Sequence, residues 1–125
     1  MPYLYADLTY DLIGACMEVH GLLGHGHKET IYADALSHEL KLRQMDFIRE
    51  KQFKVSYKDI ILPHDYYADF VVNDIIILEI KAIKELNSSH LRQTLNYLAA
   101  SQLRLGLLVN FGSPSLEFKR VIFKP

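Results

Sequence analysis

Several features that would define special protein classes are absent from this chain of 125 residues. One cysteine, Cys16, excludes an internal disulfide and points to a reducing compartment such as the cytoplasm. The four prolines form no linker, and the longest aliphatic run, residues 75–78, is far too short to cross a bilayer. The first residues lack the basic start and apolar run of a signal peptide. We therefore expect a single domain, residues 1–125, without a membrane segment.

An excess of positive or negative charge is lacking as well. The chain has 14 Lys+Arg against 15 Asp+Glu, a formal net charge of -1, so it has no global attraction to nucleic acid. Binding to DNA would require the basic residues to gather on one face. Half of the residues are hydrophobic (50%), which suffices for one core without metal or disulfide support.

Helical spacing of apolar residues predicts three helices. The first runs from about Leu8 to Leu23, where glycines end it. The second begins near Lys28 and carries one apolar stripe: Ile31, Tyr32, Ala35, Leu36 and Leu40. The third is expected to be capped by Ser88 or Ser89 and to run to about Ser101. Its inward residues are expected to be Leu91, Leu95, Leu98 and Ala99.

Alternating apolar and polar residues predict strands at 47–57 and 67–72, and buried strands at 75–81, 105–111 and 116–123. Residues 75–78 are apolar on both faces, which places this strand centrally in a covered sheet. The order is helix, helix, three strands, helix, two strands. It predicts an α+β (α/β sandwich-like) domain with a mixed sheet and helices packed against it.

Charged residues are expected to meet where the central strand ends. Glu79 and Lys81 share one face, Asp69 lies on the preceding strand, and Glu29 lies on the second helix. Carboxylates around one point bind Mg²⁺ or Mn²⁺, and an adjacent lysine can help water to attack a phosphodiester. The alternative is that the strand emerges into solvent after Leu78 and its charges are simply solvated.

Five short motifs occur in one order along nearly the whole chain. They are Gly26-x-x-Glu29-x-x-Tyr32, Tyr67-Ala-Asp69, Leu78-Glu79-Ile80-Lys81, His90-Leu-Arg-Gln93-x-x-x-Tyr97, and residues 106–112. With these motifs the chain resembles the GxxExxY proteins, a branch of the PD-(D/E)XK nuclease superfamily, from about Leu8 to Phe123.

This resemblance implies a restriction-endonuclease-like core with a mixed central sheet flanked by helices. It implies that Glu29, Asp69, Glu79 and Lys81 are catalytic. It also implies that Asp69, Glu79, Glu29 and the backbone carbonyl of Ile80 bind Mg²⁺ or Mn²⁺. The implied function is hydrolysis of phosphodiester bonds in DNA by a metal-activated water. The alternative is an inactive nuclease-fold module for binding or assembly, and a homodimer or larger homo-oligomer is a further expectation.

Other residues are expected to position the substrate. Gln93 and Tyr97 match the Q-x-x-x-Y element of RecB-like nucleases and share one helix face. Tyr32 lies one turn beyond Glu29, where its hydroxyl could steady a carboxylate. For both tyrosines the alternative is a half-buried place in the core. The candidate DNA contacts are Lys84, Arg92, Lys51 and Lys54, although strand lysines are commonly just a solvated edge.

The turn between the strands of Asp69 and Glu79 decides whether the two carboxylates can meet. A strict two-residue loop at Asn73-Asp74 would send them to opposite faces of the sheet. A shared metal ion forbids that arrangement. We therefore predict a three-residue loop, Asn73 to Ile75, or a bulge that brings Asp69 opposite Glu79.

Overall fold

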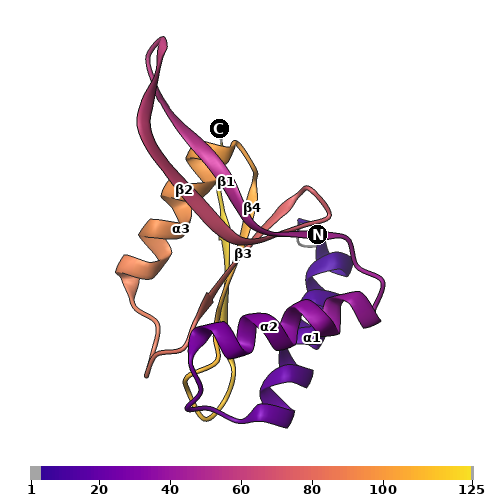
Figure 1. The fold of residues 1–125 in the computed structure, drawn as a ribbon. Coiled ribbons are helices and arrows are strands. Elements are labelled where there is room, and N and C mark those ends of the chain that lie inside the picture. Colours follow the sequence, from indigo (N-terminus) through magenta and orange to yellow (C-terminus); the bar gives the residue numbers. More distant parts are fainter. Residues whose placement is uncertain (1–3, 125) are drawn as a thin grey trace.

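The computed structural model describes residues 4–124 and has the expected order of elements (Figure 1). They are α1 (Ala6–Leu23), α2 (Glu29–Leu42), β1 (Phe47–Tyr57), β2 (Ile60–Val72), β3 (Ile76–Lys81), α3 (Ser88–Ser101), β4 (Leu105–Asn110) and β5 (Glu117–Ile122). Within the described range, no helix is both long enough and apolar enough to cross a membrane.

One five-stranded sheet forms the centre, in the order β1-β2-β3-β4-β5. Only the β3–β4 pair in this sheet is parallel, and α3 supplies the crossover that a parallel pair requires. Residues 76–80 of β3 are all buried, so the expected central strand is confirmed. The α+β fold with a mixed sheet flanked by helices is confirmed with it.

The sheet separates two groups of core residues. Helices α1 and α2 cover one face, where Leu12, Leu36 and Leu78 belong to the larger group. Helix α3 covers the other face, where Leu98 packs with Ile77 (Figure 1). Side chains alternate along a strand, so Glu79 and Lys81 face α3, whereas Leu78 and Ile80 face α2.

The turn between β2 and β3 has the odd length that we predicted. Val72 pairs with Ile76 and Phe70 pairs with Leu78, which leaves a loop of three residues, 73–75. Asn73 and Asp74 adopt φ angles of 55° and 61°, a left-handed conformation that these two residue types tolerate. Continued by one residue, this register places Asp69 opposite Glu79.

Strand β2 is longer than expected, because it begins at Ile60 instead of Tyr67. The added part of the strand contains Pro63, although proline is rare inside strands. The pairs Lys54–Asp65 and Ser56–Ile61 flank a register shift, so Pro63 lies in a bulged segment that needs no ladder hydrogen bond from it. Residues 54–65, hereafter the arm, extend beyond the helical layers (Figure 1).

Two details of the predicted helices were wrong. The N-cap of α3 is Asn87, whose side chain accepts a hydrogen bond from the Ser89 N–H at 2.9 Å. The buried face of α3 consists of Thr94 and Leu98, while Leu95 is 39% exposed and Ala99 is also exposed. A Cβ added to Gly106 of β4 would lie 2.8 Å from the Thr94 methyl carbon, so this glycine admits the close approach of Thr94.

The apolar stripe of α2 also differs from the prediction at one position. Tyr32, Leu36 and Leu40 are buried as expected, but Ile31 is 41% exposed. Ile31 directly precedes Tyr32 and therefore points about 100° away from it around the helix axis, toward solvent.

Candidate active site

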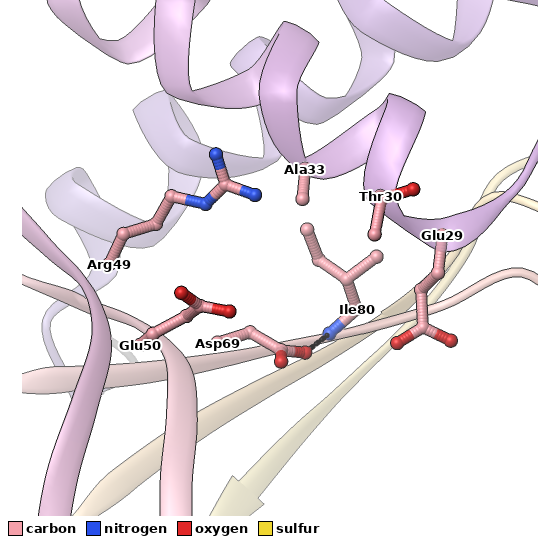
Figure 2. Close-up of a pocket in the computed structure, with 7 residues that line it drawn as sticks. All are labelled: Glu29, Thr30, Ala33, Arg49, Glu50, Asp69 and Ile80. Atoms are coloured by element: carbon pink, nitrogen blue, oxygen red, sulfur yellow. Dashed lines mark hydrogen bonds between the residues drawn. The ribbon is translucent and has the colours of Figure 1, made fainter.

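The site lies where β2 and β3 separate. Their ladder ends at the Phe70–Leu78 pair, and the next two residues replace it with side-chain hydrogen bonds. The Asp69 N–H donates to Oε2 of Glu79 at 2.8 Å. The Ile80 N–H donates to Oδ2 of Asp69 at 2.7 Å, as Figure 2 shows. Each carboxylate thus accepts a hydrogen bond from a backbone N–H that would otherwise bond to the neighbouring strand. These bonds hold both side chains in place.

Burial makes these carboxylates weak acids. Glu79 is 5% exposed, and burial, together with the nearby Asp69 carboxylate, raises its pKa to about 8. Burial also raises the pKa of Asp69, although the Ile80 N–H and the Lys81 ammonium oppose this shift. Two adjacent, poorly hydrated carboxylates ionise together only if a positive charge compensates them.

Glu29 approaches the pair from the first turn of α2 (Figure 2). Partial burial raises its pKa, and the Asp69 charge raises it further, whereas Lys81 lowers it. The three expected acidic residues therefore interact electrostatically. Even so, residues 4–124 contain no group of three or more His, Cys, Asp or Glu side chains gathered closely enough to hold a metal ion.

The donor atoms fit Mg²⁺ or Mn²⁺ in kind. Carboxylate oxygens of Asp69 and Glu79 are hard ligands, and one oxygen of each has no hydrogen-bond partner within the described residues. The carbonyl of Ile80 points to the same side of its strand as its N–H, which faces Asp69. These three residues could hold a divalent cation, and Glu29 supplies a further carboxylate in the lining of the same pocket.

Lys81 lies beside the carboxylates and contacts α3. Its ammonium lowers the pKa of Asp69, Glu79 and Glu29. Its Nζ lies 3.4 Å from Oε1 of Gln93, an exposed residue of α3. The structure therefore brings Lys81 and Gln93 together with the acidic residues.

Tyr97 is half-buried and packs into an aromatic stack. Its ring lies 4.1 Å from that of Tyr66 at an interplanar angle of 6°, and Phe53 stacks on the other face of Tyr66. Burial and the Glu79 charge both raise the pKa of Tyr97, so its hydroxyl also feels the acidic pair. Tyr97 thus combines a place in the core with proximity to the site.

Tyr32 is fully buried, and its hydroxyl does not contact a carboxylate. It donates to the Gly24 carbonyl at 2.6 Å and accepts from the His27 N–H at 3.2 Å. Its ring stacks on Phe111 at 4.8 Å. Tyr32 therefore fastens the loop between α1 and α2, which ends at Glu29.

The expected DNA contacts are dispersed. Lys84 and Arg92 are exposed on the segment after β3 and on α3. Lys51 places its ammonium 5.7 Å from the centre of the Phe53 ring, and Lys54 forms an ion pair with Asp65 at 3.0 Å. Lys54 is partly neutralised by this pair, so Lys84 and Arg92 are the more available of the four.

Arg49 and Glu50 belong to the site although the sequence did not indicate them. They line a pocket of about 180 Å³ together with Glu29, Thr30, Ala33, Asp69 and Ile80 (Figure 2). Glu50 has a φ of 53° and lies between the pairs Arg49–Phe70 and Lys51–Ala68, so it is opposite Asp69. Counting back from the Tyr57–Ile60 pair would have placed Ile48 there, because the register shift in the arm is not visible in the sequence.

Helices on both faces of a mixed five-stranded sheet are typical of a nuclease-like fold, and the acidic residues lie where two of its strands diverge. The family model of the PD-(D/E)XK nuclease superfamily matches residues 6–121, and the chain belongs to this superfamily. No curated protein matches it.

One similar solved structure is titled "Crystal structure of SSO0001". It superposes with a TM-score of 0.61 and 18% sequence identity, covering 77% of this chain and 50% of the other. At this identity the likeness shows the fold. This chain spans half the length of that protein.

Proposed function

We propose that this protein hydrolyses phosphodiester bonds in DNA with the help of Mg²⁺ or Mn²⁺, as a member of the GxxExxY branch of its superfamily. The observation that carries the proposal is the Asp69–Glu79 pair, cross-bonded at the separation of two strands, with Lys81 beside it. If these charged residues only marked a strand end in solvent, the two carboxyl groups would not need to be buried to this degree.

Each residue then has a defined task. When bound, the cation would activate water and neutralise charge on the phosphate. Asp69, Glu79 and the Ile80 carbonyl would hold it, and Glu29 would add a carboxylate from α2. Lys81, oriented by Gln93, supplies a positive charge and a proton donor next to the reacting phosphate.

Binding of the DNA backbone is assigned to residues around this pocket. Lys84 and Arg92 would contact phosphates, Tyr97 would support the α3 side of the site, and Lys51 and Lys54 would contribute weakly from β1. We place the protein in the cytoplasm as a single nuclease domain, because its one cysteine cannot form an internal disulfide. Burial raises the pKa of Cys16 to about 12, which makes its thiol unreactive.

A second candidate is an inactive module for binding or homo-oligomeric assembly. It is favoured by the absence of a preformed three-carboxylate metal group within residues 4–124. It is also favoured by apolar side chains on the arm, since Tyr57, Ile60 and Ile61 are 57%, 54% and 66% exposed.

The test is cleavage of labelled single-stranded DNA, double-stranded DNA and RNA with Mg²⁺, Mn²⁺ or EDTA. We expect metal-dependent cleavage of DNA, abolished by Asp69→Asn and Lys81→Ala. Asp59→Asn is the matched control, because Asp59 is an exposed carboxylate at the tip of the arm, and it should keep full activity. Wild-type protein that cleaves no nucleic acid with either metal, but forms a defined oligomer, would establish the second candidate.

A further inference from the structure

Among the described residues that line the pocket beside Asp69, Arg49 is the only cation (Figure 2). The other charged groups of this lining are the carboxylates of Glu29, Glu50 and Asp69. A phosphodiester that enters the pocket meets three carboxyl groups. A fixed positive charge in the wall reduces their repulsion of the phosphate, in addition to any bound cation.

The guanidinium of Arg49 is held from two sides. Its Nη1 donates to Oδ1 of Asp34 on α2 at 2.7 Å, and its Cζ lies 5.7 Å from the centre of the Phe70 ring. The hydrogen bonds that it makes within residues 4–124 occupy one of its two terminal nitrogens. The remaining N–H donors form a fork of fixed orientation, which is the geometry that binds phosphate oxygens in pairs.

Arg49 and Lys81 flank Asp69 from opposite sides. Arg49 is on β1, Asp69 on β2 and Lys81 on β3, which are neighbours in that order in the sheet. Both cations lower the pKa of Asp69, so both lie close enough to affect its charge. Arg49 lies toward α2, where it bonds Asp34, whereas Lys81 lies toward α3, where it contacts Gln93. Asp69 therefore lies between the two cations in the order of the strands, with Arg49 toward one helical layer and Lys81 toward the other.

We propose that Arg49 binds the backbone phosphate next to the one that is cleaved, and so fixes the path by which the nucleic-acid strand enters the site. This inference rests on the proposed function, because it takes the Asp69–Glu79 pair as the place of cleavage. Contact with phosphate carries no base preference, so Arg49 would act on every sequence alike.

The experiment measures binding of a fluorescent 20-nucleotide single strand and of its duplex in EDTA, over a series of salt concentrations. We compare wild type with Arg49→Gln, Arg49→Lys and Arg43→Gln. Arg43 is the matched control, because it also bonds one carboxylate at 2.7 Å, on Glu39, and its side chain is 36% exposed against 32% for Arg49. Thermal unfolding of all four proteins separates loss of binding from loss of fold.

Arg49→Gln should weaken binding about 10-fold and reduce the slope of log Kd against log salt by about one. Arg49→Lys should recover part of the affinity, and Arg43→Gln should bind as wild type. With Mg²⁺, Arg49→Gln should raise KM about 10-fold and change kcat less than about 3-fold.

If Arg49→Gln and Arg43→Gln have the same affinity and the same salt slope, the inference about Arg49 is wrong. The proposed function still stands in that case if the wild-type protein cleaves DNA. Wild-type protein that neither binds nor cleaves would overturn both.

Discussion

The backbone N–H of Asp69 is held by the side chain of Glu79, and not by a backbone carbonyl of the neighbouring strand. This bond costs the sheet one rung of its ladder and brings a buried acid against a second acid. Protonation of the two carboxyl groups, and binding of a cation between them, should therefore control the stability of the whole domain.

The first prediction concerns pH. Glu79 has a pKa raised from 4.5 to about 8, so between these values the folded protein holds a proton that the unfolded chain has lost. Stability without divalent cations should therefore fall as pH rises through this window, by up to about 1.4 kcal/mol per pH unit, and level off above pH 8.

Glu79→Gln keeps an oxygen that can accept from the Asp69 N–H, and it should remove this part of the pH dependence. Urea unfolding at several pH values in EDTA measures the difference between the two proteins. Glu18→Gln, on the exposed face of α1, is the control and should follow wild type. Parallel curves for wild type and Glu79→Gln would show that Glu79 is ionised in the folded protein.

The second prediction concerns the cation. A ligand that binds only the folded state stabilises it by about 1.4 kcal/mol when its concentration is about ten times Kd. Millimolar Mg²⁺ or Mn²⁺ should therefore raise Tm, more at pH 8 than at pH 5, because the buried carboxylates must lose protons to bind it.

The double variant Asp69→Asn/Glu79→Gln should lose this effect. Differential scanning calorimetry at the two pH values measures it, with NaCl at the same ionic strength as the control. A wild-type Tm that ignores both metals would argue against a functional metal site.

The third prediction separates two lysines. Lys81 lies among the carboxylates, whereas Lys84 is exposed beyond the end of β3. Lys81→Ala should lower kcat roughly 100-fold or more with DNA affinity largely kept. Lys84→Ala should weaken binding and reduce its salt slope by about one, with modest effect on kcat.

Single-turnover kinetics at saturating enzyme give the chemical step, and anisotropy titrations give Kd. Equal losses of affinity with unchanged turnover in both variants would make Lys81 part of a basic surface only. The binding module would then become the leading function.

The fourth prediction concerns the loop that leads to Glu29. Tyr32→Phe removes the hydroxyl that bonds the Gly24 carbonyl and the His27 N–H. The loss should cost about 1 kcal/mol of stability, because two partly buried hydrogen bonds are lost. Tyr10→Phe is the control, since Tyr10 is 80% exposed, and chemical denaturation of both variants gives the values. If Tyr32 acts only on the fold, kcat per folded molecule should stay unchanged in Tyr32→Phe.

Local periodicity predicted the elements well because the signals lie in neighbouring residues. The apolar run at residues 75–78 predicts a central strand. The requirement that Asp69 face Glu79 was enough to predict the length of the turn between β2 and β3. The acidic residues were singled out from the order of the elements, because Asp69 and Glu79 lie on two adjoining strands and Glu29 lies at a helix start.

What the sequence could not indicate depends on distant backbone geometry. The register shift between Lys54 and Ser56 moves the β1 pairing by two residues, and this shift brings Glu50 opposite Asp69 and Arg49 beside it. The rotation of α3 is set by Gly106 on another element, which admits Thr94 in place of Leu95. Neither relationship has a signal in local sequence.

The carboxylate bonds to the Asp69 and Ile80 amides also make the site observable without substrate. Amide hydrogen exchange at an interior strand position normally reports opening of the sheet. At these two positions the acceptor is a titratable side chain, so protection should respond to anything that draws Glu79 or Asp69 away. The exchange rates of the Asp69 and Ile80 amides should therefore report directly whether a ligand or cation occupies the pocket.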